Sequence, residues 1–303
     1  MEEPKSVIFC MKPISAAGSD GMNGYFFQMY WHIIKDDLMG VVKVFISGKI
    51  IPKYFSHSCI ILLPKVSNQN KLTEFRPISQ SNFTCKIISK LVNTTVTPIL
   101  PSLISSSRSG FVNGRSILEN LTLGQEIIQR IKKPNIGSNF IIKLGMAKAF
   151  DRVSWSYMCL VLRKMRFAEI FIDMVLRIMA NNWYSIIVNA KRYGFFNSTR
   201  GLEQCEPLSP ALFILVAEVL SRSLNRLHSH PDYHGFFMEK RGPQDYTMTN
   251  KITQLWRQSR TYKACVTGNT HTLTISSRDG GMRERDITGH HGIISAFLMM
   301  KGK

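Results

Sequence analysis

The stretch SNFIIKLGMAKAFDRVSW, residues 138–155, is the part of the chain where residue types and spacing first suggest a site. Its apolar run Phe140–Leu144 is rich in β-branched residues and follows turn-forming residues, which predicts a buried strand. The run ends at Gly145 and passes into residues 146–151, which can begin a helix. A strand that turns into a helix exposes its end at the rim of a sheet, where ligands commonly bind.

Metal and redox chemistry based on cysteine or histidine has weaker support. The cysteines are far apart and include no CxxC pair, so they predict neither a zinc site nor a redox motif. We expect them to be reduced residues of the core: Cys10, Cys59, Cys85, Cys159, Cys205 and Cys265. Histidines gather at residues 228–234 and 290–291, but their irregular spacing is more typical of solvated loops than of metal ligands.

The charge of the chain favours a polyanionic partner. Lys and Arg total 39 against 20 Asp and Glu, a formal charge of +19, and nucleic acid is the first candidate. The alternative is a surface that is merely basic. The acidic start MEEPKSVIFC differs from a signal peptide, so we expect an intracellular protein, in nucleus or cytoplasm. The apolar run 211–217 is too short to span a bilayer.

Strand and helix patterns alternate along the 303 residues, which indicates an α+β fold. Helical spacing of apolar residues predicts helices within 26–45, 84–95, 117–131, 161–178 and 212–227. Short apolar or β-branched runs predict strands within 59–63, 140–144, 184–188 and 194–197. The last two would be joined at Asn189–Ala190, since Asn suits a tight turn. Residues 245–303 are polar and basic without clear periodicity, so no element is assigned there and we expect poor order.

Seven segments, in order, resemble the reverse transcriptases of LINE-type (non-LTR) retrotransposons, and most of all their plant members. They cover roughly residues 11–243 and read GSDGMNGYFF (18–27), IILLPK (60–65), FRPIS (75–79), SGFVNGRSILEN (109–120), IIKLGMAKAFDRVSW (141–155), GFFNSTRGLEQCEPLSPALFIL (194–215) and AEVLSRSLNRL (217–227). The resemblance implies a right-hand polymerase fold with an antiparallel sheet and packed helices. Residues 1–137 would be fingers, 138–244 a partial palm with motifs A and B, and 245–303 an unrelated basic tail, with the thumb absent.

The resemblance also implies nucleotide- and template-binding residues. Lys65 and Arg76 would face the template and the incoming dNTP, and an Arg guanidinium can bind phosphate bidentately. Phe150 would pack under the nucleotide sugar, and Gln204 would lie near template and nucleotide. For Lys65 a solvated charge at a strand end is the alternative. Arg76, read here as preceding Pro77 at a helix entry, could equally be structural, and Phe150 could be ordinary core.

The family's catalytic carboxylates are not matched. The family uses two Mg²⁺ ions held by one Asp of motif A and an Asp pair of motif C. Gly145 occupies the motif A Asp position, and after HGFFMEKRGPQ (234–244) the chain continues DYTMTNKITQLW without an Asp pair. Asp151 would lie about 9 Å further along a helix, and Glu206 has no partner carboxylate in the sequence. We therefore expect no intact catalytic residue, no metal site and no bound Mg²⁺.

The motif B segment departs from the usual RGLRQGDPLSP at three positions, with Glu203 for Arg, Cys205 for Gly and Glu206 for Asp. Cys205 is the most disruptive on physical grounds, because Gly suits a turn that a Cβ would obstruct. The sequence thus predicts a reverse transcriptase domain fragment without catalytic activity, with RNA or an RNA–DNA hybrid as partner. The alternatives are a non-catalytic nucleic-acid-binding remnant, and the product of a decayed element with no function.

Overall fold

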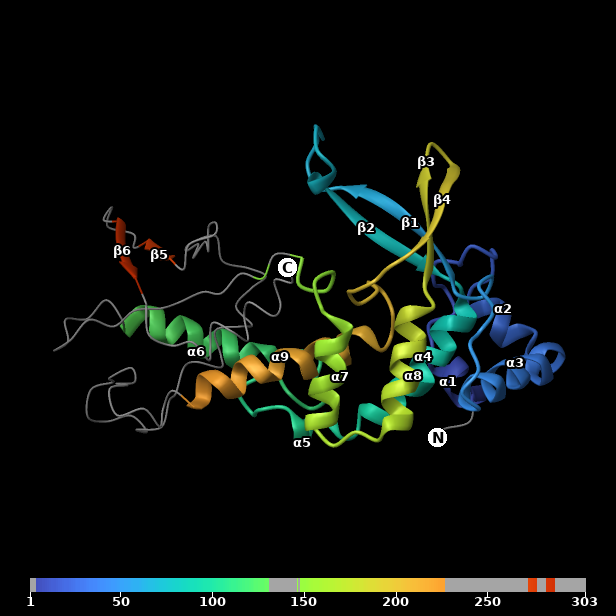
Figure 1. Ribbon diagram of the computed structural model, residues 1–303, viewed down its shortest axis with the longest axis horizontal. Helices are drawn as coiled ribbons and strands as arrows, with labels where there is room; N and C mark the ends of the chain where they lie inside the picture. The colour runs from blue at the N-terminus through green and yellow to red at the C-terminus, as the bar shows by residue number, and fades with distance from the viewer. Residues whose placement is uncertain (1–3, 131–145, 147, 227–271, 277–281, 287–303) are drawn as a thin grey trace. The chain divides into compact units, whose positions relative to one another are not determined.

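The computed structural model describes residues 4–130, 146, 148–226, 272–276 and 282–286 (Figure 1). The chain divides into two compact units, the first formed by Met1–Ile99 with Phe150–Val216 and the second by Leu100–Ala149 with Ala217–Lys303. The predicted boundaries between fingers, palm and tail, at residues 137 and 244, lie outside the described residues and stay predictions.

Most helices of the first unit bury one apolar face, as the spacing of their apolar residues predicted. The helices are α1 (Pro4–Cys10), α2 (Gly24–Met29), α3 (Trp31–Ile46), α4 (Phe83–Val96), α7 (Trp155–Lys164), α8 (Glu169–Ala180) and the first half of α9 (Ser209–Asn225). Gly48 follows α3 with φ of +91°, a conformation that ends helices readily at glycine. Ile87 of α4 and Val175 of α8 are fully buried, so these helices contribute to the core beneath the sheet.

The first unit also contains a four-stranded sheet. It consists of β1 (His57–Pro64), β2 (Phe75–Ser81), β3 (Trp183–Val188) and β4 (Lys191–Asn197), in the order β2-β1-β3-β4. The predicted β3–β4 hairpin is antiparallel, and β1 also pairs antiparallel with β2, a strand that the sequence did not predict. Because β1 and β3 run parallel, the sheet is mixed and not purely antiparallel as the resemblance implied. The α+β class is confirmed, and the mixed sheet fits a partial fingers and palm fold.

The two hairpins separate toward their tips. β1 pairs with β3 only over His57–Ile61, whereas its pairing with β2 continues to Pro64. In Figure 1 the β1–β2 and β3–β4 hairpins accordingly diverge above α4 and α8. The second hairpin turns at Asn189 and Ala190 with φ of +49° and +61°, the left-handed pair that a two-residue turn requires. The prediction of a turn at these residues is confirmed.

Arg76 and Pro77 lie within β2, so the interpretation of this pair as a helix entry is wrong. Pro77 is opposite Leu62 on a strand at the edge of the sheet, where the missing N–H of proline is tolerated. The helix expected to follow begins later, at Phe83. The connection between β1 and β2 contains a short 3₁₀ turn, Leu72–Glu74.

The second unit contains α5 (Leu100–Leu103), α6 (Ile117–Arg130), the second half of α9, and a two-stranded antiparallel sheet of β5 (Thr272–Ser276) and β6 (Met282–Asp286). This small sheet lies in the segment to which the sequence assigned no element. Among the helices that the structure describes, none combines the length and apolar character needed to cross a membrane.

Candidate functional site

The β1–β2 hairpin brings Lys65 and Arg76 to its tip. Leu63 pairs with Arg76, and the Lys65 N–H continues the ladder by donating to the Glu74 carbonyl at 2.8 Å. Both side chains are exposed. The Lys65 ammonium donates to the Thr73 carbonyl at 2.9 Å, whereas the Arg76 guanidinium has no hydrogen-bond partner among the described residues. The structure thus places two cations near the tip of the β1–β2 hairpin (the fingertip), and Arg76 has fewer described hydrogen bonds than Lys65.

A second group forms where the turn at residues 148–152 meets the loop that precedes α9. The Gly201 N–H donates to the Val153 carbonyl at 2.8 Å, and the Leu202 N–H donates to the Phe150 carbonyl at 2.9 Å. Gly201 has φ of +89°, and a Cβ there would lie 3.0 Å from the Asp151 carbonyl oxygen. This close approach requires glycine and brings Phe150 and Gln204 into one site.

Phe150 is half-buried, and its ring stacks on Phe213 of α9 with 4.6 Å between centroids and 13° between planes. This contact positions the ring, and both the core interpretation and the nucleotide interpretation stay open. No described hydrogen bond joins the Phe150–Gln204 group to Lys65 or Arg76.

Asp151 lies in a turn and not in a helix, because α7 begins only at Trp155 with Ser154 as its N-cap. The expectation of a helical Asp151 is therefore wrong, and the rise of a helix no longer supports the 9 Å separation from Gly145. Gln204 Nε2 donates to Asp151 Oδ1 at 3.3 Å. The motif A position itself, Gly145, lies outside the described residues together with the predicted strand 140–144.

Glu203 and Glu206 form a buried carboxylate pair, which sequence reasoning missed. Both side chains are almost inaccessible, with 6% and 4% of their surface exposed. Asn182 Nδ2 donates to Glu203 Oε2 at 3.0 Å, and Ser81 Oγ donates to Glu206 Oε2 at 3.3 Å. The Oε1 atom of each carboxyl has no described partner. Since Glu206 does have a carboxylate neighbour, the sequence-based expectation about Glu206 is wrong.

Burial raises the pKa of both glutamates, and the charge of Glu206 adds to the rise for Glu203. The pKa of Glu203 rises to about 8, first through desolvation and then through the charge of Glu206. Desolvation likewise raises the pKa of Glu206, opposed by hydrogen bonds from Ser89 and Ser81 and by the charge of Lys86. At neutral pH the pair therefore holds at least one proton, which makes it a poor ligand for a hard cation.

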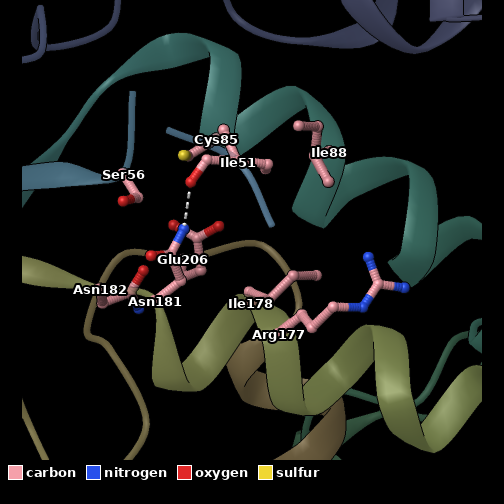
Figure 2. A pocket seen from close by; sticks show the side chains of 9 residues that line it. All are labelled: Ile51, Ser56, Cys85, Ile88, Arg177, Ile178, Asn181, Asn182 and Glu206. Atoms are coloured by element: carbon pink, nitrogen blue, oxygen red, sulfur yellow. Dashed lines mark hydrogen bonds between the residues drawn. The ribbon is translucent and has the colours of Figure 1, made fainter. Parts of the chain in front are cut away.

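A small cavity of about 20 Å³ adjoins Glu206, enough for a single water. Figure 2 shows Glu206 below Cys85 of α4, with Asn181, at the end of α8, and its neighbour Asn182 close by. Asn181 Nδ2 donates to the Ile51 carbonyl at 2.7 Å, which fixes the amide at this wall. Burial and the charge of Glu206 raise the pKa of the Cys85 thiol well above its usual range, so this thiol is unreactive.

Cys205 lies between the two glutamates with φ of +72°, in the left-handed region that favours glycine. The prediction that a glycine suits this position better is confirmed. Cys205 and Cys10 are exposed, so the expectation of core cysteines is wrong for these two, whereas Cys59 and Cys159 are buried. Cys265 lies outside the described residues.

The described residues do not fit a two-metal site. Within them no group of three or more His, Cys, Asp or Glu side chains is placed to hold a metal ion. An adjacent Asp pair does occur at Asp36–Asp37, but both residues are exposed in the middle of α3. Neighbouring residues of a helix point about 100° apart, unlike the hairpin pair of motif C. Histidines 228–234 and 290–291 lie outside the described residues.

Comparison with known proteins supplies the family. Residues 63–238, more than half of the chain, match the family described as reverse transcriptase (RNA-dependent DNA polymerase). The chain belongs to the reverse transcriptase family. The matched residues include the last two residues of β1, all of β2, the β3–β4 hairpin, the Glu203–Glu206 loop and α9.

This reverse transcriptase chain is also similar to proteins of transposable elements. It is 25% identical to the transposon TX1 uncharacterized 149 kDa protein of Xenopus laevis over 218 residues, and the matched region covers 72% of this chain and 17% of that protein. It is 23% identical over 237 residues to the Pol polyprotein of the type-1 retrotransposable element R2 of Nasonia vitripennis, covering 78% of this chain and 22% of the relative. A type-2 R2DM polyprotein of Drosophila melanogaster is 24% identical over 213 residues, covering 70% and 20%.

The chain thus spans about a fifth of the length of these relatives. The resemblance to non-LTR retrotransposon reverse transcriptases is confirmed. Its plant-like character stays a prediction, as do the roles of Lys65, Arg76, Phe150 and Gln204.

Proposed function

We propose that this reverse transcriptase domain binds nucleic acid but does not catalyse RNA-directed DNA synthesis. The observation that carries the proposal is the set of carboxylates. Gly145 stands where the family has its motif A Asp, and no adjacent Asp pair follows Asp36–Asp37. Two-metal nucleotidyl transfer needs carboxylates to hold ions on both the attacking and the leaving oxygens.

The carboxylates near the site do not replace them. Asp151 accepts a hydrogen bond from Gln204, and the Glu203–Glu206 pair is buried and retains a proton at neutral pH. None of the three belongs to a described cluster of metal ligands.

Binding is supported by charge and by the fingertip. The chain carries a formal charge of +19, and Lys65 and Arg76 are exposed at the tip of one hairpin. The proposed partner is RNA or an RNA–DNA hybrid, with dNTP as a further ligand of the same cations. Arg76 can bind a phosphate through two N–H groups, since its guanidinium has no described partner.

A primer-extension assay tests the catalytic half of the proposal. We expect no template-directed product with Mg²⁺ or Mn²⁺, and none from Gly145→Asp alone, because the motif C carboxylates would still be missing. Template-directed extension by the wild-type chain overturns the proposal. Asp151→Asn and Glu206→Gln variants would then show whether either carboxylate takes part.

Salt titration tests the binding half. Each lost phosphate contact should lower the slope of log K against log salt by about 0.7–0.9. We therefore expect Lys65→Gln and Arg76→Gln each to reduce the slope for an RNA–DNA hybrid. Lys164→Gln, which changes an exposed lysine near the end of α7, is the matched control and should leave the slope unchanged. Wild-type affinity that does not vary with salt contradicts this half.

A further inference from the structure

A second, open pocket lies between strand β4 and the loop that precedes β1, and its lining includes none of the family-motif residues Lys65, Arg76, Phe150 and Gln204. Its volume is about 570 Å³, within the range of ligand-binding clefts. Two aromatic rings and two cations line it: Tyr54, Phe195, Lys53 and Arg192. None of these residues was singled out in the sequence, because they come from a loop and an edge strand far apart in the chain.

The aromatic rings are exposed but held from behind. Phe195 is 55% exposed, and one side of its ring stacks on Trp183 with 4.8 Å between centroids and 12° between planes. Tyr54 is 68% exposed and packs against Phe55 with centroids 4.2 Å apart. Rings that are exposed yet supported by a second ring offer flat, preorganised surfaces for stacking.

The two cations are fixed beside these rings. Lys53 Nζ lies 3.9 Å from the centre of the Trp183 ring, a cation–π contact. Arg192 Nη2 donates to the Ser19 carbonyl at 2.9 Å, and its other N–H donors have no described partner. A guanidinium has five N–H donors, so this side chain retains the capacity to bind a phosphate.

The remaining lining groups leave the pocket positively charged. Asp20 is its one carboxylate, and Asp20 Oδ1 accepts from the Met22 N–H at 3.0 Å. Burial and the charge of Arg192 lower the pKa of His57, so its imidazole is neutral at physiological pH. Buried Asn82 accepts from Ser19 Oγ at 2.9 Å and donates to the Tyr54 carbonyl at 3.0 Å. Its side chain therefore links the Ser19 and Tyr54 sides of the pocket.

We infer that this pocket binds a single-stranded polynucleotide segment, with a base stacked on Phe195 or Tyr54 and its phosphates on Lys53 and Arg192. The inference rests on the nucleic-acid partner of the proposed function and adds where and in which form it binds. Supported rings beside cations are the combination that holds unpaired strands, since every base has a face that can stack. Bases inside a duplex cover their faces with their neighbours, and an apolar peptide would gain nothing from the two cations.

Fluorescence anisotropy with a labelled 15-nucleotide oligo(U) and an RNA–DNA duplex of equal length tests the inference on the full chain. Phe195→Leu should weaken oligo(U) binding by about 5- to 100-fold and leave duplex binding nearly unchanged. Lys53→Gln and Arg192→Gln should each lower the salt slope for oligo(U) by about 0.7. Phe9→Leu on α1 and Lys164→Gln on α7 are matched exposed controls and should change neither quantity.

The outcomes separate the two proposals. If wild-type chain binds oligo(U) with salt dependence and Phe195→Leu behaves like Phe9→Leu, the pocket is not the site and the proposed function stands. If wild-type chain binds neither oligonucleotide, the nucleic-acid partner itself is contradicted. Sedimentation measures whether the wild type and Phe195→Leu self-associate. If only the wild type does, the surface binds a second copy of the chain and the inference is overturned. Tyr54→Leu tests the second ring of the pocket in the same way. A melting temperature equal to that of the wild type shows for each variant that weaker binding does not come from loss of the fold.

Discussion

Both units bury glutamate side chains, but they surround them differently. In the second unit Glu218 of α9 is fully buried, and Arg108 Nε lies 3.7 Å from its Oε2 atom. Arg108, itself 6% exposed, also donates to Ser221 Oγ at 2.6 Å. In the first unit Glu203 has Glu206 as a charged neighbour and no ion pair with a cation is described for either, although the charge of Lys86 acts on both; hydroxyl and amide groups donate to them.

The difference shows what a buried charge needs. An opposite charge offsets part of the desolvation cost of Arg108 and Glu218, whereas two neighbouring carboxyls add to each other's cost and hold a proton instead. The first unit should therefore respond to pH above the normal carboxyl range, and the second to loss of a partner. The usual family pattern has Arg and Asp where this chain has Glu203 and Glu206, so a like-charge pair stands in place of opposite charges.

The largest effect is expected from Arg108→Met. It leaves Glu218 buried without Arg108, and breaking a buried pair costs about 3–5 kcal/mol in the free energy of unfolding. Arg222→Gln is the control, since Arg222 contacts the same carboxyl at 3.4 Å but is 56% exposed; it should cost less than about 1 kcal/mol. Equal losses in urea denaturation would contradict the distinction between the two arginines.

The next effect concerns pH. Because the pKa of Glu203 rises from 4.5 to about 8 on folding, its stabilising contribution is complete below pH 4.5 and is lost as pH rises toward 8. Between these pH values the free energy of unfolding should fall by about 1.4 kcal/mol per pH unit for one such proton. Glu203→Gln should remove this dependence and raise the free energy of unfolding at pH 8 by roughly 2–4 kcal/mol.

Urea denaturation at several pH values between 4.5 and 8.5 measures this slope. Glu169→Gln is the control, because Arg163 lowers the pKa of exposed Glu169 and its titration lies below this range. A wild-type stability that rises between pH 5 and 8, or a Glu203→Gln slope equal to that of wild type, would show that the pair does not retain a proton.

A smaller, pH-independent gain is expected from Cys205→Gly in the same loop. Relief of the left-handed strain at φ +72° should exceed the added entropy of the unfolded chain, for a net gain of about 0.5–1 kcal/mol. Cys205→Ala keeps the Cβ and should give no such gain. If the two variants melt alike, backbone strain at this position is not a cost.

The smallest effect is expected from Gln204→Ala, which removes the hydrogen bond to Asp151. The bond is partly solvent-exposed and 3.3 Å long, so its loss should cost no more than about 0.5 kcal/mol at every pH. A pH-dependent loss would mean that Asp151 takes part in the proton balance now assigned to the glutamates.

Periodicity in the sequence was sufficient for most helices and strands, because their apolar faces recur locally. The turn at Asn189–Ala190 could also be predicted from local sequence, because Asn readily adopts the left-handed conformation that a two-residue turn needs. Arg76–Pro77 was misassigned because proline suits both a helix entry and an edge strand, and the pairing with β1 decides between them.

The candidate site was predictable only where family motifs carried it. Lys65 and Arg76 do meet at one fingertip, and Phe150 and Gln204 do lie on joined segments. The buried Glu203–Glu206 pair depends on serines and an asparagine from distant elements, such as Ser81 and Asn182. Arg108 and Glu218 are likewise 110 residues apart, so no local pattern could have paired them.

The central claim is that this reverse transcriptase domain binds a primer–template without extending it. The most direct measurement is a single-turnover extension assay on a DNA primer annealed to an RNA template, with enough protein to bind all of it. Anisotropy measures the bound fraction, and a gel of the same sample measures the length of the primer. We predict a saturated, salt-sensitive complex with no primer lengthened by even one nucleotide in Mg²⁺ or Mn²⁺. Addition of the nucleotide complementary to the template, in preference to the other three, would contradict the account.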